Sequence, residues 1–233
     1  ILINTNILEA CRWYKVPKVV SLLSTCIYPD SSSYPLTETQ IHAGEPHESN
    51  FGYAYAKRML HIQSKAYRRQ YGCNFICAVP NNLFGKHDNF DLENGHVIPA
   101  VIRKIYDAKN IGSESVTFWG DGTPLREFTY NEDIANALMF LLENYDGETP
   151  VNIGNTSEIS IRDLVEHVAN IFDYTGDILW DTEKPKGQHR KPSDNSLLKS
   201  LGFQYRYTDI EKSLADTCDW FSKNHPNVRG INL

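Results

Sequence analysis

The sequence has 233 residues, of which 41% are hydrophobic and 22% are charged, a composition typical of a globular protein with one large domain or two small ones. Its formal net charge of −6 argues against a nucleic-acid-binding protein, which usually has a basic excess. No apolar run approaches the roughly twenty residues that span a bilayer, so we expect no membrane partner. The 5 cysteines are scattered and form no C-x-x-C pair. This spacing argues against a disulfide framework or a metal site and fits a reducing compartment, which we take to be the cytoplasm.

The first part of the chain predicts a helix followed by a strand. Apolar residues recur at helical spacing from Leu2 to Cys11, and Pro17 ends the pattern. The run Lys18–Ser24 is nearly continuous in apolar residues, as in a parallel strand that is covered on both faces. The sequence begins inside the helical pattern, without methionine or a basic leader. We therefore expect a chain cut within an element rather than a signal peptide.

Polar residues follow this strand. Ser24, Thr25 and Cys26 lie just past its carboxyl end, the edge at which doubly wound sheets bind ligands. Residues 27–48 form a polar loop that is too long for a simple connection, and we expect it to have a functional role.

The next helix carries a tyrosine and a lysine on one face. Either Ser49 or Asn50 can cap it, and it is predicted to run to about Gln70. Tyr53 and Lys57 are four residues apart, one turn along the same face. A phenol beside an ammonium group is a plausible proton donor, because the positive charge favours the phenolate and lowers its pKa. Taken alone, the pair is more often an ordinary surface contact.

The remaining sequence continues the alternation of strands and helices. We expect strands at 74–79, 116–119 and 151–153, helices at 96–109, from 131 and at 160–172, and a tail with a strand from 177, a basic loop at 184–191, a short helix from Asp194 and a closing helix from Asp209. This order predicts an α/β protein with a doubly wound, Rossmann-like, mainly parallel sheet. No glycine-rich phosphate loop of the G-x-x-G-x-x-G kind occurs in the sequence.

Seven short segments are informative when they are taken together: Leu23–Pro29, Tyr53–Lys57, Pro80–Gly85, His87–Phe90, Gly95–Pro99, Phe118–Gly120 and Arg126–Phe128. With them the chain resembles the extended short-chain dehydrogenases/reductases, and among these the GDP-L-fucose synthase family. The tyrosine–lysine pair marks only the superfamily, whereas the serine–threonine–cysteine run and Gly95–Pro99 are more selective. The resemblance implies an enzyme that epimerises carbons 3 and 5 of GDP-4-keto-6-deoxy-D-mannose and reduces carbon 4 with NADPH, giving GDP-L-fucose.

The resemblance also implies a role for each catalytic group. The ketone at carbon 4 acidifies the hydrogens on carbons 3 and 5, and inversion needs a base on one face of the sugar and an acid on the other. Cys26 is implied as the base and His96 as the acid. Tyr53 protonates the oxygen at carbon 4 during reduction, Ser24 hydrogen-bonds the same oxygen, and Lys57 binds the nicotinamide ribose.

Binding residues follow from the same resemblance. The implied contacts to NADP(H) are Leu22, Leu23, Ser24, Thr25, Tyr53, Lys57, Pro80, Asn81, Asn82, Leu83 and His96. The implied contacts to the GDP-sugar are Asn82, Lys104, Trp119, Arg126 and Asp194. Lys104 stands where the family has an arginine, so that contact differs from the family pattern.

Each of these residues also has an ordinary structural explanation. Cys26 could be a packed thiol at a strand end, and His96 could cap the helix that begins there. Trp119 could belong to the core, Arg126 could form a surface ion pair with a neighbouring glutamate, and Asp194 could cap a helix. Two other functions also stay open: a related sugar-nucleotide epimerase or dehydratase, and a non-catalytic module for sugar-nucleotide binding or dimerisation.

The resemblance also predicts domains and assembly. We expect residues 1–85 and 127–155 to form the remaining part of a dinucleotide-binding domain, and residues 86–126 and 156–233 to form a smaller α/β substrate domain. The family has a further N-terminal region with the glycine loop that binds pyrophosphate, so these residues alone should bind NADPH weakly. A homodimer is expected through the helices at 2–14 and 52–70, which carry apolar residues on more than one side: Ile3, Leu8, Met59, Ile62 and Tyr67.

Overall fold

The computed structural model describes residues 1–184 and 190–231. In chain order the elements are α1 (Leu2–Trp13), β1 (Val19–Leu22), α2 (Phe51–Tyr71), β2 (Phe75–Pro80), β3 (Asn82–Phe84), α3 (Val97–Asn110), β4 (Ser115–Trp119), β5 (Leu125–Tyr130), α4 (Asn131–Asn144), β6 (Val151–Ile153), β7 (Glu158–Ser160), α5 (Ile161–Ile171), β8 (Asp177–Asp181), α6 (Ser196–Ser200) and α7 (Ile210–Asn224). The predicted α/β class with a parallel sheet is confirmed. Strands β3, β5 and β7 were not among the predicted strands. They form one sheet whose strands pair across long sequence separations, and such pairing leaves no local pattern. Most of the basic loop expected at 184–191 lies outside the described residues.

The chain divides into two compact units. The first comprises residues 1–82, 133–156 and 192–206, and the second comprises 83–132, 157–191 and 207–233.

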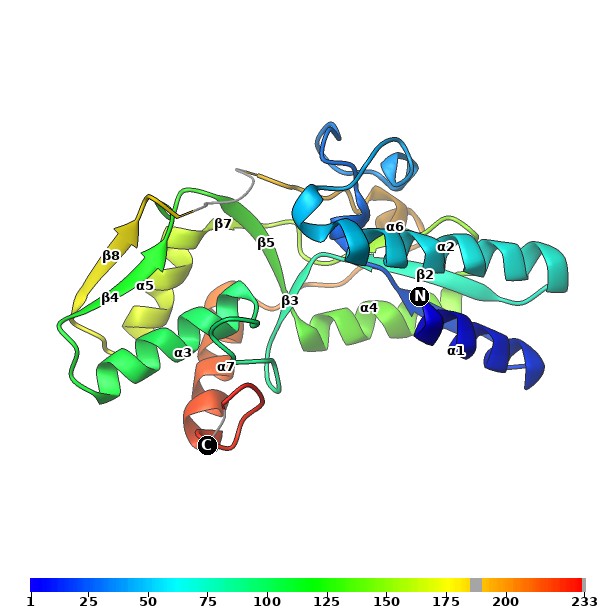
Figure 1. The fold of residues 1–233 in the computed structure, drawn as a ribbon. Helices are drawn as coiled ribbons and strands as arrows, with labels where there is room; N and C mark the ends of the chain where they lie inside the picture. Colours follow the sequence, from blue (N-terminus) through cyan, green and yellow to red (C-terminus); the bar gives the residue numbers. More distant parts are fainter. Residues whose placement is uncertain (185–189, 232–233) are drawn as a thin grey trace. The chain divides into compact units, whose positions relative to one another are not determined.

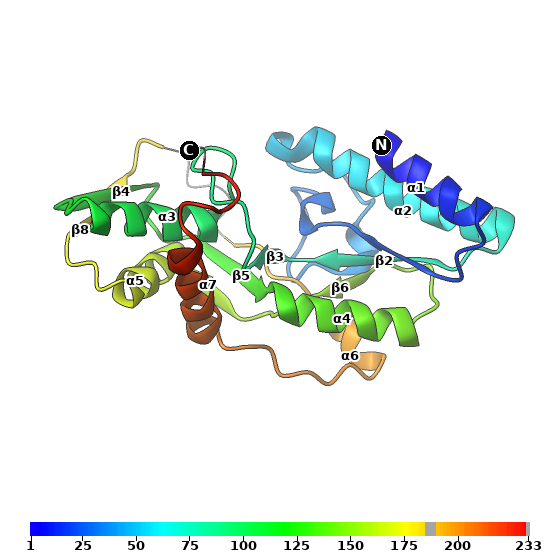
Figure 2. The same cartoon turned by 90° about the horizontal axis from the view of Figure 1, so that it is seen from below.

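In the first unit, a parallel sheet has the strand order β1-β2-β6. Every residue of the central strand β2 is buried, as a strand covered on both faces requires. Figure 2 shows α1 and α2 on one face of this sheet and α4 on the other. Leu8 of α1 is buried, and Tyr67 of α2 packs against the core of this unit. Helix α2 ends where Gly72 adopts a left-handed φ of 67° and its N–H bonds back to the Arg68 carbonyl.

Helix α2 begins differently from the prediction. Asn50 occupies the N-cap position, but its side chain makes no capping hydrogen bond. A 3-10 turn at Glu48–Asn50 leads directly into the helix instead. The amide of Asn50 donates to the Ser49 hydroxyl at 3.4 Å, so the side chain points to its neighbour rather than to the free N–H groups of the first turn.

The two compact units divide the chain differently from the expected domains. Residues 192–206 belong to the first unit rather than the second, because their backbone pairs with the loop that follows β1. Leu36 N–H donates to the Pro192 carbonyl at 2.8 Å, and Asp194 N–H donates to the Leu36 carbonyl at 2.9 Å. Residues 83–85 and 127–132 fall in the second unit, where β5 pairs with β7 in antiparallel fashion. Pairing between segments distant in sequence leaves no local pattern.

In the second unit, two small sheets have the orders β3-β5-β7 and β4-β8. Helices α3, α5 and α7 pack together beside them (Figure 1). Ser160 caps α5 as predicted, since its hydroxyl accepts the Asp163 N–H at 3.0 Å. The buried centre of this unit is formed mainly by Phe84, Phe90, Ile98, Ile102, Ile105, Phe128, Leu164, Val165, Val168, Leu214 and Phe221.

The long loop at 27–48 is held by a buried polar network in the first unit. The Tyr28 hydroxyl donates to Asn152 Oδ1 at 2.6 Å. The backbone N–H of Asn152 donates to a carboxylate oxygen of Glu38 at 2.9 Å. Burial raises the pKa of the Glu38 carboxyl, and the hydrogen bond from Asn152 opposes that shift. The loop is therefore an ordered part of the unit.

Candidate functional site

The first group of predicted site residues lies at the carboxyl end of β1. Ser24 continues the extended backbone, and a 3-10 turn at Thr25–Ile27 then reverses the chain. The Ser24 hydroxyl accepts the backbone N–H of Cys26 at 3.3 Å, and the Cys26 thiol is half-buried. The local sequence therefore fixes both groups at the edge of the sheet where ligands bind.

Helix α2 brings Tyr53 to this strand end. Tyr53 is 50% exposed, and its hydroxyl is hydrogen-bonded to the Ser24 side chain. Burial raises the pKa of Tyr53; the Ser24 hydrogen bond opposes this shift, and the electrostatic interaction with the neighbouring Cys26 adds to it. The expected lowering of this pKa by Lys57 is therefore wrong. The lysine Nζ lies 5.8 Å from the Tyr53 ring centroid, and it donates to the Leu22 carbonyl at 2.7 Å.

The Lys57 ammonium suits the ribose role that the resemblance implies. It has three N–H donors, and the contact with the Leu22 carbonyl uses one of them. Burial lowers its pKa, because a charged amine loses hydration there. The remaining donors at this strand end fit the adjacent hydroxyls of a ribose.

The other residues expected to bind the cofactor differ in how exposed they are. Leu23 and Thr25 are buried, whereas Leu22 is 38% exposed. After β2, Asn81 is buried and its amide donates to the Asn155 carbonyl at 2.8 Å. Pro80 is buried, Leu83 is partly buried, and Asn82 is exposed. Asn82 is thus the member of the Pro80–Leu83 turn whose side chain reaches the surface most freely.

Arg58 supports this site, and sequence reasoning missed it. It is only 6% exposed. Its Nε donates to the Ile27 carbonyl and its Nη1 to the Gly44 carbonyl, each at 2.7 Å. The arginine therefore holds the turn that follows Cys26. A signal was available in the sequence, since Arg58 follows Ala54 by one helical turn and so lies on the face of α2 that packs inward.

A second group of predicted residues lines a cavity of about 640 Å³ in the second unit. His96, Lys104, Trp119 and Arg126 all contribute to its wall. His96 is the N-cap residue of α3, but its side chain makes no capping hydrogen bond. The imidazole is exposed, so the capping explanation for this side chain is not supported.

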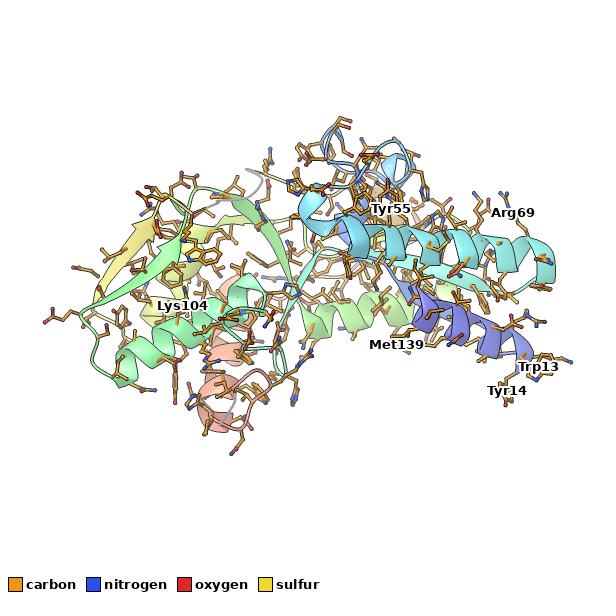
Figure 3. The ribbon with its side chains drawn as sticks, viewed as in Figure 1. Trp13, Tyr14, Tyr55, Arg69, Lys104 and Met139 are labelled. Atoms are coloured by element: carbon orange, nitrogen blue, oxygen red, sulfur yellow. The ribbon has the colours of Figure 1, made fainter. Side chains whose placement is uncertain are left out.

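The cavity combines two cations with apolar walls. Lys104 donates to the Thr117 carbonyl at 3.2 Å and lies 5.4 Å from the Phe118 ring centroid; burial lowers its pKa. Lys104 is labelled on α3 in Figure 3. Arg126 donates to the Leu125 carbonyl at 2.7 Å. Trp119 is 66% exposed, so it does not belong to the core. A cavity of this kind suits an anionic ligand that also presents a flat, apolar face.

Asp194 belongs to the first unit and is absent from the cavity wall. One of its carboxylate oxygens accepts the Ser196 N–H at 2.6 Å, at the beginning of α6. Hydrogen bonding to Ser196 lowers the pKa of this carboxyl. Its carboxylate thus bonds the N–H of the first residue of α6, whereas the N-cap position itself is occupied by Asn195.

Two further properties concern the described ranges, 1–184 and 190–231. No group of three or more His, Cys, Asp or Glu side chains within them could hold a metal ion. No helix in that part of the chain combines the length and apolar character needed to cross a bilayer.

Comparison with known proteins gives consistent similarities. Residues 1–154 match the model of the NAD dependent epimerase/dehydratase family. GDP-L-fucose synthase of Dictyostelium discoideum is 42% identical over 229 residues, which cover 97% of this chain and 71% of that protein. The Escherichia coli (strain K12) GDP-L-fucose synthase is 35% identical over 238 residues, covering 98% and 74% respectively. The crystal structure of a GDP-L-fucose synthetase from Naegleria fowleri bound to NADP superposes with a TM-score of 0.94 at 39% identity and covers 97% of this chain and 72% of that one.

Proposed function

The chain belongs to the NAD dependent epimerase/dehydratase family and, within it, to the GDP-L-fucose synthases, and we propose that it converts GDP-4-keto-6-deoxy-D-mannose to GDP-L-fucose with NADPH. The observation that carries this proposal is the cluster at the end of β1. There a hydroxyl, a thiol and a phenol (Ser24, Cys26 and Tyr53) come together. Ser24 and Cys26 are joined by a hydrogen bond, and both residues influence the pKa of Tyr53. A simple reductase needs the hydroxyl and the phenol, whereas an epimerising one also needs a base such as the thiol.

Reduction uses the phenol as an acid. NADPH, when bound, supplies the hydride for carbon 4. Tyr53 gives its proton to the oxygen of that carbon, and Ser24 donates a hydrogen bond to the same oxygen as negative charge develops. Because burial raises the pKa of Tyr53, the phenol stays protonated at neutral pH. Lys57 holds the ribose, which fixes the position from which the hydride is delivered.

Epimerisation uses a base and an acid. The Cys26 thiolate removes the hydrogen next to the ketone as a proton, and the electron pair of the broken C–H bond moves onto the ketone oxygen as an enolate. His96 then returns a proton to the same carbon from the opposite face, which inverts it. We assign the diphosphate of the substrate to Arg126 and Lys104, and an apolar contact to Trp119.

One experiment tests the assignment of these groups. The full protein is incubated with GDP-4-keto-6-deoxy-D-mannose in deuterium oxide, with and without NADPH, and the label on carbons 3 and 5 is followed by NMR. We expect label incorporation without NADPH and GDP-L-fucose formation with it. Cys26→Ser should suppress the label while some reduction of the unepimerised ketone persists. Undiminished exchange in both Cys26→Ser and His96→Asn would place the base and the acid elsewhere.

We also propose a homodimer formed through α1 and α2. Figures 1 and 2 show these helices side by side. Apolar residues at successive turns of α2 are exposed: Phe51 48%, Tyr55 37%, Met59 42% and Ile62 45%. On α1, Ile3 and Ile7 are 74% and 54% exposed. Exposed apolar residues on two neighbouring helices suit a self-complementary, two-fold interface.

Sedimentation velocity at micromolar concentration tests the dimer. The double variant Met59→Glu, Ile62→Glu should sediment as a monomer. Met139→Glu is the matched control, since Met139 is 54% exposed on α4 and projects from another helix (Figure 3). A wild-type protein that sediments as a monomer would rule out this interface. We place the enzyme in the cytoplasm, in keeping with its 5 free cysteines; imaging of a fluorescent fusion in an organelle would contradict this.

A further inference from the structure

An arginine next to the cavity of the second unit holds two segments that are distant in sequence. Arg103 lies on α3, about two turns after His96. Its Nη1 donates to the Phe90 carbonyl at 3.0 Å and to the Gly230 carbonyl at 2.9 Å. A further hydrogen bond joins the same segments, because Phe90 N–H donates to the Arg229 carbonyl at 2.9 Å. These contacts fasten the loop before α3 to the 228–231 segment.

The contact region is partly buried and closely packed. Phe90 is fully buried, and its ring centroid lies 4.5 Å from that of Phe221. Gly230 has a left-handed φ of 88°. A Cβ atom at this glycine would lie 2.2 Å from Asn89 Oδ1 and 2.3 Å from the Asp91 nitrogen. The backbone at position 230 therefore lies so close to the loop that only glycine fits there.

A short series of hydrogen bonds runs from Asp91, which contacts the 228–231 segment, to the residue before His96. The Asp91 carboxylate accepts the backbone N–H groups of Glu93 at 3.0 Å and Asn94 at 2.6 Å. The Gly95 N–H donates to the Asp91 carbonyl at 2.9 Å. The turn from Asp91 to Gly95 is thus closed on itself, and its last residue precedes His96. Glu93, Gly95 and His96 all line the cavity, so the position of this turn sets part of the cavity wall.

We propose that Arg103 is a positioning residue for epimerisation: by fastening the 90–95 turn to the 228–231 segment, it fixes the place from which His96 returns its proton. This inference rests on the proposed function of His96. Arg103 itself is not among the residues that line the cavity. Its guanidinium fork suits the task, because one rigid group can bond two carbonyls at once.

The test is the stereochemistry of the product. If His96 is displaced, deprotonated sugar is reprotonated without inversion, and reduction then yields 6-deoxyhexoses that were not inverted at carbon 3 or 5. Arg103→Gln in the full protein should lower the rate of GDP-L-fucose formation roughly ten- to a hundredfold at saturating substrate, and it should raise the share of uninverted products. Gly230→Ala should act in the same direction, and Arg103→Lys should be intermediate.

Product composition separates positioning from stability. Partial unfolding lowers the amount of active enzyme but leaves the ratio of products unchanged. Asp107→Asn is the control for Arg103, since it removes a 3.4 Å ion pair and leaves both carbonyl contacts in place. Gly112→Ala is the control for Gly230, because Gly112 also has a positive φ but has no atom within 4 Å of the added Cβ. Both controls should keep the wild-type product ratio.

The outcomes are distinguishable. A wild-type product ratio in Arg103→Gln and Gly230→Ala, combined with a shifted ratio in His96→Asn, would overturn the positioning role alone. An unshifted ratio in His96→Asn would instead overturn the assignment of His96, and with it part of the proposed function. Shifted ratios in all three variants, with unshifted controls, are the result we expect.

Discussion

The cluster at the end of β1 and the cavity of the second unit are built in different ways. In the cluster, Ser24 and Cys26 share one turn, and Tyr53 and Lys57 share one helical face. In the cavity, His96 and Lys104 come from α3, whereas Trp119 and Arg126 come from β4 and β5. Within the cluster, each pair of groups is thus set by local geometry, whereas the cavity residues are collected from several elements. Under the proposed function, we expect substitution of Tyr53 in the cluster to change turnover and substitution of Arg126 in the cavity to change affinity. His96, the proposed acid, is the member of the cavity wall whose loss should change turnover.

The largest expected effect is that of removing the phenolic hydroxyl. Tyr53→Phe should lower turnover by about two to four orders of magnitude, because the proton donor for reduction is lost, and substrate affinity should hardly change. Steady-state kinetics of NADPH oxidation measure this effect. Tyr55→Phe, on the same helix, should behave like wild type. Near-normal reduction by Tyr53→Phe would remove this residue from the mechanism.

A smaller effect should follow from loss of the arginine behind the cluster. Arg58→Met leaves the buried Ile27 carbonyl and the partly buried Gly44 carbonyl without their charged donor, and we expect a loss of about 2 to 3 kcal/mol in the free energy of unfolding. Urea denaturation monitored by fluorescence measures it. Arg69→Met on the same helix is the control, because Arg69 forms an exposed ion pair with Glu148 (Figure 3). Equal losses in the two variants would show that Arg58 has no special role.

For Arg126 in the cavity, we expect a substitution to change the affinity of the protein for the GDP-sugar. Arg126→Gln should weaken binding of the GDP-sugar roughly tenfold or more, since a charged, forked donor to phosphate is replaced by a neutral one. The rate at saturating substrate should change little. Calorimetric titration and kinetics together separate the two quantities. Lys223→Gln, which breaks an exposed ion pair on α7, is the control; a drop in turnover without loss of affinity would contradict the division between cluster and cavity.

The smallest effect concerns the loop that follows the cluster. Burial raises the pKa of Glu38 in the folded state, so the folded protein holds this proton more tightly than the unfolded chain. Ionisation of Glu38 at neutral pH therefore costs stability, and the cost disappears once the pH falls below the ordinary range of a glutamate. Glu38→Gln keeps an oxygen for the Asn152 N–H and should stabilise the protein at pH 7 by about 1 kcal/mol or less. Urea denaturation at pH 7 and at pH 4 measures this; an equal difference at both values would contradict the explanation.

The cluster at the end of β1 and the cavity also differ in how much of each could be predicted from the sequence. Most helix and strand boundaries, and the relation between Tyr53 and Lys57, follow from local periodicity. The cluster at Ser24 could be located because a strand end is visible in the chain. The roles of His96, Lys104, Trp119 and Arg126 came from resemblance alone, since residues on three elements show no common spacing. The membership of residues 192–206 and the support from Arg58 depend on contacts across long sequence separations, and the pKa of Tyr53 depends on burial that sequence does not reveal.

The division of the first unit into three segments has a consequence for protein synthesis. Strand β2 is translated early. Its neighbour β6 is translated only after helix α3 and strands β4 and β5 of the second unit. Until then, one edge of β2 has no partner and can pair with other chains. We therefore expect nascent chains that end before residue 151 to be more sensitive to protease, and more dependent on chaperones, than chains that extend beyond residue 206. Protease digestion of ribosome-bound chains of graded length measures this, and equal resistance at the two lengths would show that the early segment folds without β6.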